Sequence, residues 1–196
     1  MLKESIGAST VLKKIISLVD DKVKKQDFCV VAIDGMAGAG KTTLSKELKK
    51  YYGIKANVIS IDDFYQPWIV TSLNNGLAPH INKTRILNEI LKPIYLKKDI
   101  HYTPFNCKEQ RYENYIHLKH KPISIIEGSY SCLPIFEIYY DLKLLLITST
   151  IQQKRRLLKR EGENNLKNFE EIWLPRESKY FLETDIVNRM DLILKS

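Results

Sequence analysis

The chain has 196 residues, of which 44% are hydrophobic and 28% are charged, and its formal net charge is +8. This length fits one domain with its own core, and no apolar run approaches the roughly 20 residues that span a bilayer. Three cysteines without metal-like spacing, and no recognisable secretion signal at residues 1–10, lead us to expect reduced thiols in a cytoplasmic protein without a membrane partner.

The excess of basic residues is spread along the chain in short doublets such as Lys13-Lys14 and Lys97-Lys98. Such doublets are typical of solvated helix faces, whereas a nucleic-acid site gathers its basic residues on one surface. We therefore expect a small-molecule partner rather than nucleic acid. The sequence leaves open whether the chain forms a homo-oligomer.

The first predicted element is a helix that Ser9 or Thr10 would cap. The apolar residues that follow recur with a helical period: Val11, Leu12, Ile15, Ile16, Val19 and Val23. A short apolar stretch rich in β-branched residues, 28–33, comes next and is typical of a fully buried strand. The helix is therefore expected to pack on a sheet that contains this strand.

The most informative motif of the chain follows that strand: Gly35-Met36-Ala37-Gly38-Ala39-Gly40-Lys41-Thr42-Thr43. It has the form G-x-x-x-x-G-K-T, a phosphate-binding loop between a strand and a helix. Its glycines let backbone N–H groups turn toward a polyphosphate, and the helix start adds partial positive charge. Lys41 is expected to reach the β- and γ-phosphates, and the Thr42 hydroxyl is expected to hold Mg²⁺.

This motif predicts that the chain binds ATP and Mg²⁺, with GTP left open as the nucleotide. The predicted nucleotide-binding residues are Gly35, Gly38, Ala39, Gly40, Lys41, Thr42 and Thr43. The alternative is a glycine-rich turn that merely links a strand to a helix. The strand before the motif and the helical pattern after it favour the phosphate loop.

Strands and helices alternate along the rest of the chain, and Gly53 is expected to end the first helix after the loop. The predicted strands cover 57–61, 122–126, 142–148 and 190–194, and the predicted helices cover 84–98, 151–161 and 166–183. Pro93 should kink or end the first of these helices, and Pro175 lies inside the last one. The turn-rich segment 68–80 could cover the site, and the aromatic-rich segment 99–118 is expected to form a hairpin or flap.

This alternation predicts an α/β protein with a three-layer P-loop NTPase fold. Its sheet should be parallel and five-stranded, with helices on both faces. We expect a single domain over residues 1–196, with an acceptor-side flap at 99–118 and a helical lid at 151–165.

Two carboxylates, Asp62 and Glu127, each follow a predicted buried strand. The carboxyl ends of parallel strands meet at one edge of the sheet, so both side chains should lie beside the phosphate loop. Phosphoryl transfer needs a metal and a group that orients the nucleophile, and carboxylates serve both needs. Asp63 neighbours Asp62, and the sequence alone does not separate their roles.

Arg156 and Arg160 are four residues apart on a predicted helix and therefore share one face. Such a pair can close over the β- and γ-phosphates and neutralise charge that develops in the transfer. The alternative is that the basic residues of this helix form a solvated face.

Two motifs are more specific than the phosphate loop: Asp62-Asp63-Phe64-Tyr65 and Glu127-Gly128-Ser129-Tyr130-Ser131-Cys132. Together with Tyr102-Thr103-Pro104-Phe105-Asn106-Cys107 and Trp173-Leu174-Pro175-Arg176-Glu177, they make the chain similar to one group of P-loop kinases. The chain resembles the uridine kinase/phosphoribulokinase group, and especially small bacterial uridine kinase-like proteins, over residues 30–190.

The resemblance implies a role for several residues. Asp62 matches the catalytic carboxylate that accepts a proton from the acceptor hydroxyl, and Glu127 matches the acidic residue near the metal. Tyr65 matches an aromatic residue beside the acceptor, and Tyr102 matches one in the nucleoside-side flap. The lid segment of the family covers both Arg156 and Arg160.

The chain departs from the family pattern at two acceptor positions. Asn82 stands where uridine–cytidine kinases have an aspartate that grips the ribose hydroxyls. Cys107 stands where they use a histidine to bind the pyrimidine edge, and a thiol is a weak hydrogen-bond partner. Because a polar substrate edge is recognised through its polar partners, these two departures leave the acceptor open.

The sequence therefore favours an ATP-dependent kinase that phosphorylates a hydroxyl of a small molecule, nominally a nucleoside such as uridine or cytidine. The predicted catalytic residues are Lys41, Asp62, Arg156 and Arg160; the metal ligands are Thr42 and Glu127; and the acceptor-binding residues are Asp62, Tyr65, Asn82, Tyr102 and Cys107. One alternative is a nucleotide or coenzyme-precursor kinase. Another is a nucleotide-binding regulator or nucleic-acid-binding protein without small-molecule turnover.

Overall fold

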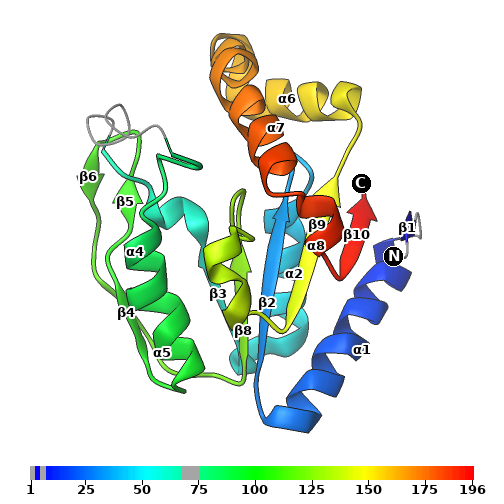
Figure 1. Ribbon diagram of the computed structural model, residues 1–196, viewed down its shortest axis with the longest axis vertical. Coiled ribbons are helices and arrows are strands. Elements are labelled where there is room, and N and C mark those ends of the chain that lie inside the picture. The colour runs from blue at the N-terminus through cyan, green and yellow to red at the C-terminus, as the bar shows by residue number, and fades with distance from the viewer. Residues whose placement is uncertain (1–2, 5–7, 68–75) are drawn as a thin grey trace.

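The computed structural model describes residues 3–4, 8–67 and 76–196. Its centre is a parallel sheet with the strand order β1-β10-β9-β2-β8-β3 (Figure 1). These strands are β1 (Lys3–Glu4), β2 (Cys29–Gly35), β3 (Ala56–Ser60), β8 (Ile123–Glu127), β9 (Leu142–Ile147) and β10 (Leu192–Lys195). The five longer strands confirm the predicted parallel sheet, and the two-residue β1 extends its edge beside β10.

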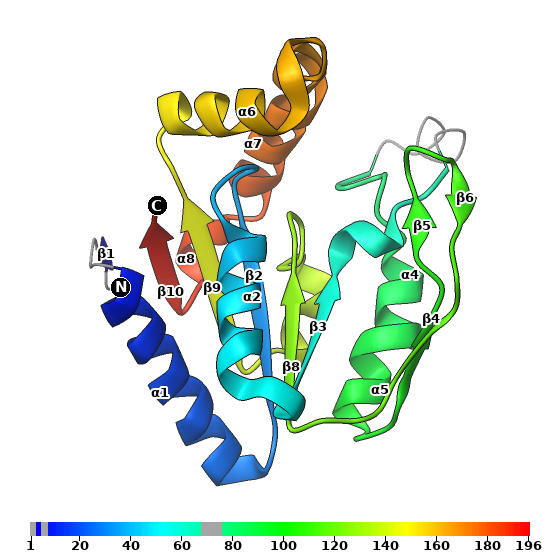
Figure 2. The same ribbon diagram turned by 180° about the vertical axis from the view of Figure 1, so that it is seen from behind.

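β2 lies inside the sheet, and its residues supply a core on each face. Cys29, Val31 and Ile33 belong to one buried cluster, while Val30 and Ala32 belong to the other. This alternation follows from the two-residue period of a strand. α1 (Ala8–Gln26) and α2 (Lys41–Tyr52) cover the first cluster, and they lie together on the near face of the sheet in Figure 2.

The ends of these two helices test two predictions. Since α1 begins at Ala8, Ser9 and Thr10 lie inside the helix, and the prediction that one of them caps it is wrong. α2 ends at Tyr52 as predicted, because Gly53 adopts a φ of 55° and donates its N–H to the Lys49 carbonyl. A 3₁₀ turn, η1 (Gly53–Lys55), then leads into β3.

The opposite face of the sheet is covered by a helix built from three consecutive pieces. These are α4 (Lys83–Arg85), the π-helical η3 (Ile86–Leu91) and α5 (Lys92–Tyr95), and the 3₁₀ segment η4 (Pro134–Tyr139) and α8 (Ile186–Arg189) lie on the same side. Pro93 was predicted to kink or end this helix, but the helix continues past it to Tyr95. The wider π turns just before it relieve the clash that a proline ring makes in a regular α-helix.

The segment predicted as a hairpin forms two short antiparallel ribbons. β4 (Ile100–Tyr102) pairs with β7 (Ile116–Leu118), and β5 (Phe105–Asn106) pairs with β6 (Arg111–Tyr112). The hairpin runs beside α4 and α5 in both side views, with β5 and β6 near the end that faces the helices at 150–168 and 174–183 (Figures 1 and 2).

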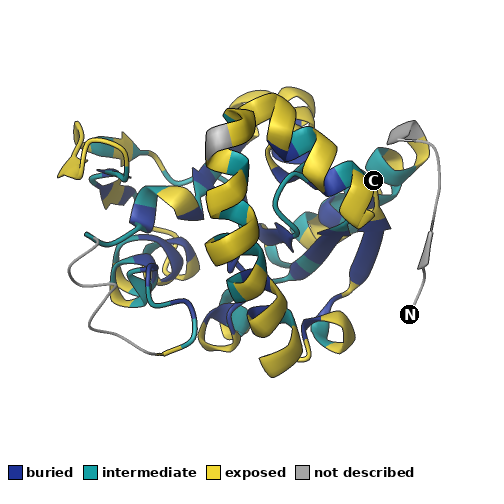
Figure 3. Ribbon diagram, turned by 90° about the horizontal axis from the view of Figure 1, so that it is seen from above, coloured by how far each residue is buried: buried dark blue, intermediate teal, exposed yellow. Residues whose placement is uncertain are grey.

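Two long helices lie across the carboxyl ends of the strands. They are α6 (Thr150–Asn168) and α7 (Leu174–Glu183), joined by the π-helical η5 (Phe169–Trp173), and we call them the lid helices after the lid predicted at 151–165. Figure 3 shows mostly exposed residues on their outer surface. Gly162, with φ 77° and ψ 170°, breaks α6 where the sequence predicts the end of a helix at 161. Pro175 occupies the first turn of α7, where a proline is tolerated.

A turn-rich loop was predicted at 68–80, and its residues 68–75 lie outside the described part of the chain. Before it, β3 leads into the 3₁₀ segment η2 (Ile61–Phe64), and after it the chain enters α4. Among the residues that the structure describes, no helix combines the length and the apolar character needed to cross a bilayer.

Candidate functional site

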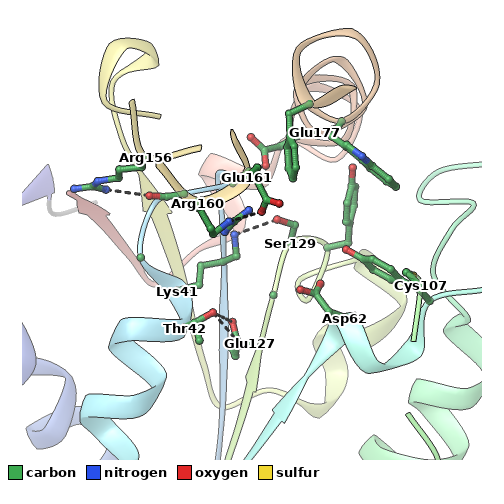
Figure 4. Close-up of a pocket in the computed structure, with 18 of the residues that line it drawn as sticks. Lys41, Thr42, Asp62, Cys107, Glu127, Ser129, Arg156, Arg160, Glu161 and Glu177 are labelled. Atoms are coloured by element: carbon green, nitrogen blue, oxygen red, sulfur yellow. Dashed lines mark hydrogen bonds and ion pairs between the residues drawn. The ribbon is translucent and has the colours of Figure 1, made fainter. Parts of the chain in front are cut away.

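A cavity of about 720 Å³ lies where the phosphate loop, the ends of β3 and β8, the hairpin and the lid helices meet (Figure 4). Its lining residues are Ala37, Gly38, Gly40, Lys41, Thr42, Thr43, Asp62, Tyr65, Cys107, Lys108, Glu127, Gly128, Ser129, Tyr130, Arg156, Arg160, Glu161, Phe169, Trp173 and Glu177. The structure therefore brings most of the predicted site residues to one place.

The backbone of the phosphate loop requires glycine at its two ends. A Cβ at Gly35 would lie 2.0 Å from the Leu146 carbonyl oxygen, so β2 and β9 approach too closely there for any side chain. Gly40 adopts a φ of 96° directly before α2, a left-handed conformation that other residues rarely take. The loop consequently presents the N-terminal end of α2 to the cavity.

Lys41 is held against the loop by three hydrogen bonds. Its Nζ donates to the carbonyls of Gly35 at 2.8 Å and Met36 at 3.0 Å, and to Ser129 Oγ at 3.0 Å. The ammonium therefore lies at the cavity wall between the loop and the turn after β8 (Figure 4).

Thr42 and Glu127 face each other below this lysine. The Thr42 hydroxyl donates to both carboxylate oxygens of Glu127, each at 3.3 Å. Burial raises the pKa of Glu127, and the charge of Asp62 raises it further, while Lys41 and the Thr42 hydrogen bond lower it. A hydroxyl and a carboxylate are the hard oxygen donors that Mg²⁺ prefers, so this pair fits the predicted metal site.

The structure separates the two adjacent aspartates that the sequence could not distinguish. Asp62 is exposed, and its carboxylate lines the same cavity as that of Glu127 (Figure 4). Asp63 is not a lining residue, and its Oδ2 accepts a 3.0 Å hydrogen bond from the Tyr102 hydroxyl. Burial raises the pKa of Asp63, and the Tyr102 hydrogen bond opposes that rise.

Both lid arginines line the cavity from α6. The Nη1 of Arg156 donates to the Gly38 carbonyl at 3.1 Å and to Ser196 Oγ at 2.9 Å. Arg160 donates through Nε to Glu161 at 2.6 Å, and its guanidinium lies 5.8 Å from the Phe169 ring centroid. The shared helix face predicted for the two residues is therefore the face that borders the cavity.

Four predicted site residues are not among the lining residues. Gly35 and Ala39 lie within the loop backbone. The side chain of Asn82 caps α4 by accepting the Arg85 N–H at 3.1 Å, and Tyr102 is 5% exposed with its ring stacked on Phe64. The acceptor-binding roles of Asn82 and Tyr102 stay predictions, and the hairpin borders the cavity through Cys107 and Lys108 instead.

Sequence reasoning gave no role to Glu177, which lines the cavity from α7. Its Oε2 accepts the Ala37 N–H at 2.6 Å, and its Oε1 accepts a hydrogen bond from Gln153 at 3.2 Å. Gln153 also donates to the Ala37 carbonyl at 3.1 Å, so both lid helices contact the tip of the phosphate loop. Burial raises the pKa of Glu177, while the charge of Lys41 lowers it.

A second residue without a predicted role is Asp34, which is fully buried beneath the loop. Its two oxygens accept four hydrogen bonds, from the N–H groups of Gly35, Tyr130 and Cys132 and from the Tyr180 hydroxyl. Burial raises the pKa of Asp34, and these donors lower it. One carboxylate thus ties together β2, the turn after β8 and α7.

Aromatic side chains form the wall of the cavity opposite the phosphate loop. The rings of Tyr65 and Trp173 are nearly parallel, with an angle of 12° and centroids 6.5 Å apart. His80 meets both rings edge to face, with its centroid 5.3 Å from Tyr65 and 5.1 Å from Trp173. Neither ring nitrogen of His80 has a hydrogen-bond partner among the described residues, and its side chain is 2% exposed.

Burial, followed by the charges of Arg176 and Lys83, lowers the pKa of His80 to about 3. The folded chain therefore keeps His80 neutral, whereas the unfolded chain protonates it below the ordinary value of 6.5. Stability from this group is present above pH 6.5 and is lost as the pH falls toward 3.

We expect His80→Phe to remove this pH dependence. Between pH 6.5 and 5, His80 should lower the unfolding free energy of the wild-type chain by about 1.6 kcal/mol, and the variant should lack this contribution. Denaturant unfolding of both proteins at the two pH values measures it. Equal losses in the two proteins would contradict a buried, neutral His80.

A smaller cavity of about 500 Å³ lies on the other side of the phosphate loop. Val11, Leu44 and Leu194 give it apolar walls, and Arg156 and the C-terminal Ser196 border it. The two cavities share Gly38, Gly40, Thr43 and Arg156, so the loop and the first lid arginine separate them.

No family model matches the chain, and no curated protein matches it in sequence. Solved structures do match it. A possible uridine kinase from Bacillus stearothermophilus has a TM-score of 0.66 at 14% identity, and the match covers 92% of this chain and 99% of that one. YFH7 from Saccharomyces cerevisiae, a proposed P-loop kinase with a circular permutation, has a TM-score of 0.62 at 13% identity and coverages of 97% and 99%.

The YGR205w protein is also similar, with a TM-score of 0.54, 16% identity and 87% coverage of both chains. Identities this low show a shared fold and leave the substrate undetermined. The parallel sheet, the phosphate loop and the helices over its carboxyl edge therefore give the chain the fold of P-loop kinases.

Proposed function

We propose that the chain is an ATP-dependent kinase that transfers the γ-phosphoryl group to a hydroxyl of a small molecule with a planar ring, nominally a nucleoside such as uridine or cytidine. The observation that carries this proposal is the single cavity shared by Lys41, Thr42, Glu127, Asp62 and the two lid arginines. Phosphoryl transfer depends mainly on positioning and on charge neutralisation, and these side chains supply both.

The donor side follows from the loop. Backbone N–H groups of residues 38–41 bind the phosphates, and the Lys41 ammonium reaches the β- and γ-phosphates from the wall where Ser129 holds it. Thr42 and Glu127 would hold Mg²⁺, which supplies charge neutralisation between the phosphates when bound. The apolar walls of the smaller cavity suit the flat faces of adenine.

On the acceptor side, Asp62 accepts the proton of the attacking hydroxyl. Its carboxylate lies at the cavity wall between the phosphate loop and the aromatic side chains, so it can touch an acceptor that stacks there. Arg156 and Arg160 move with the lid onto the transferring group and stabilise the charge that develops on its oxygens. Asp63, engaged with Tyr102, supports the hairpin instead.

The planar ring of the acceptor is inferred from the aromatic side chains of Tyr65 and Trp173. Both line the cavity, and a flat ring can stack on side chains of this kind. His80 is not a lining residue, and it packs edge to face against both rings, which supports their positions in the wall.

We expect Trp173→Ala to raise KM for the acceptor about tenfold, because base stacking on an aromatic side chain contributes roughly 1–3 kcal/mol. Trp173→Phe should restore most of the affinity, and KM for ATP should stay close to the wild-type value in both variants. Steady-state kinetics with each substrate varied in turn measure this. If Trp173→Ala weakens ATP and acceptor equally, the residue supports the lid and does not stack on the acceptor.

Substrate-dependent ADP release tests the proposed function directly. The panel contains nucleosides, nucleoside monophosphates and coenzyme precursors with free hydroxyl groups, each with ATP and Mg²⁺. Turnover with nucleosides supports the proposal, whereas turnover confined to phosphorylated acceptors or coenzyme precursors replaces it with the alternative kinase. No ADP release with any acceptor, together with salt-sensitive RNA or DNA binding, would favour the nucleotide-binding regulator.

A further inference from the structure

A second group of polar side chains lies on the hairpin, outside the cavity lining. The antiparallel register of β4 and β7 sets His101 directly opposite His117. The two imidazole rings stack with centroids 4.4 Å apart and planes 15° apart. Asp99 precedes β4, and its Oδ2 lies 2.9 Å from His117 Nε2. Two imidazoles and one carboxylate therefore meet on one surface of the hairpin.

The ligand atoms of these three residues converge. One atom from each of Asp99, His101 and His117 lies within 4.8 Å of the others. Ligand atoms around tetrahedral Zn²⁺ are about 3.3 Å apart, since each bond is about 2.0–2.1 Å long. To close this difference the side chains must rotate out of their stacked arrangement, and both histidines are exposed.

Neighbouring residues orient the ligand atoms of Asp99 and His101. Asp99 accepts hydrogen bonds from Lys119 Nζ at 2.8 Å and from the His120 N–H at 2.9 Å, which orient its carboxylate beside His117. The Tyr115 hydroxyl lies 2.5 Å from Nδ1 of His101. A proton on that Nδ1, donated to the tyrosine oxygen, leaves Nε2 of His101 unprotonated and able to bind a metal.

We propose that Asp99, His101 and His117 form a Zn²⁺ site, with water as the fourth ligand. Two imidazoles and a carboxylate suit Zn²⁺ better than Mg²⁺ or Ca²⁺, which prefer oxygen donors alone. The cation now beside the carboxylate is Lys119, whose Nζ lies 2.8 Å from Asp99 Oδ2. Its side chain is 76% exposed, so it moves into solvent when the metal binds.

The site has a structural consequence for the hairpin. Zn²⁺ joins the segment before β4 to both β4 and β7, at the end of the hairpin opposite the β5–β6 ribbon. Cys107 and Lys108 lie between β5 and β6 and line the cavity. The metal therefore stabilises the base of the element that borders the proposed acceptor site, and the inference itself stands whether or not the chain is a kinase.

Calorimetric titration of the full chain with Zn²⁺, after removal of bound metal and with excess Mg²⁺ present, tests the site. The parent for these titrations carries Cys107→Ser, because a partly exposed thiol also binds Zn²⁺. We expect one Zn²⁺ per chain. His101→Gln and His117→Gln should each weaken it about tenfold or more, and His120→Gln should bind like the parent, because His120 reaches Asp99 through its backbone N–H.

Amide chemical shifts provide the second readout. In ¹H–¹⁵N spectra, Zn²⁺ should shift the amides of residues 99–102 and 115–120 and leave those of the phosphate loop in place, and thermal unfolding should confirm that every variant is folded. Three results would overturn the proposal: no binding by the parent, undiminished binding by both glutamine variants, or shifts centred on the cavity.

Discussion

Changing Asp62 to Asn is expected to lower kcat by about 10²–10⁴-fold and to leave the affinity for ATP nearly unchanged. The amide keeps the size of the side chain and its place at the cavity wall, but it cannot accept the proton of the attacking hydroxyl. The phosphates bind elsewhere, at the loop backbone and Lys41, so the donor site stays intact. Turnover with the best acceptor, together with direct ATP titration, measures the two effects.

The neighbouring residue provides a matched control. Asp63→Asn makes the same chemical change one position along the chain, at a carboxylate that accepts from Tyr102 and does not line the cavity. We expect the stability to fall by at most roughly 1.5–3 kcal/mol, the contribution of one hydrogen bond to a carboxylate. We expect kcat to change by less than about tenfold, because Asp63 does not line the cavity. Equal losses of kcat in the two variants would reject Asp62 as the proton acceptor.

One further effect of Asp62→Asn has to be separated from catalysis. The charge of Asp62 raises the pKa of Glu127, so its removal should ease ionisation of Glu127. That change favours metal binding and cannot by itself lower turnover. Repeating the kinetics across a Mg²⁺ titration distinguishes the cases: loss of kcat at saturating Mg²⁺ identifies a missing base, and full recovery at high Mg²⁺ identifies a metal-binding defect.

The sequence was sufficient for the features that depend on local pattern. The apolar run at 28–33 and the glycine spacing at 35–40 predict a strand and a phosphate loop without reference to distant residues. Asp62 and Glu127 could be placed at one edge because the carboxyl ends of parallel strands always meet there. Strand boundaries moved by at most two residues, whereas the helices predicted at 151–161 and 166–183 form the continuous series α6, η5 and α7. The α1 cap was misplaced because Ser9 and Thr10 lie inside the helix.

What the sequence could not supply depends on contacts between distant segments. Asp62 and Asp63 have the same chemistry, and only the packing of the hairpin assigns one to the cavity and the other to Tyr102. Glu177 lies 140 residues from its partner Ala37, so no local pattern indicates that contact. His80 follows a proline in a loop, and only the fold brings its ring against those of Tyr65 and Trp173.

Asp34 has the widest structural influence among these unassigned residues. Its carboxylate accepts the N–H groups of Tyr130 and Cys132, which lie after β8, and the hydroxyl of Tyr180, which lies on α7. The lid helix α7 also contacts the loop through Glu177 and Ala37. The position of the lid relative to the phosphate loop is therefore fixed partly by one buried carboxylate.

Replacing Asp34 with Ala should lower the free energy of unfolding by about 3–5 kcal/mol, a large share of the 5–15 kcal/mol typical of a domain. Removing a buried charge is sometimes neutral, but here three backbone N–H groups and one hydroxyl would remain buried without an acceptor. Denaturant unfolding measures the loss. Stability within about 1 kcal/mol of the wild type would show that water or a neighbouring group replaces the carboxylate.

Tyr180→Phe keeps the prediction testable if the alanine variant does not fold. It removes a single donor to Asp34 and should cost about 2 kcal/mol, because the acceptor is a buried carboxylate. The matched control is Tyr140→Phe, whose hydroxyl donates at 2.8 Å to the neutral carbonyl of Ser131 and should cost only about 1 kcal/mol. Since both variants lose one phenolic hydroxyl, a larger loss for Tyr180 isolates the contribution of the Asp34 carboxylate, and equal losses would show that the charge adds nothing to the contact between α7 and the phosphate loop.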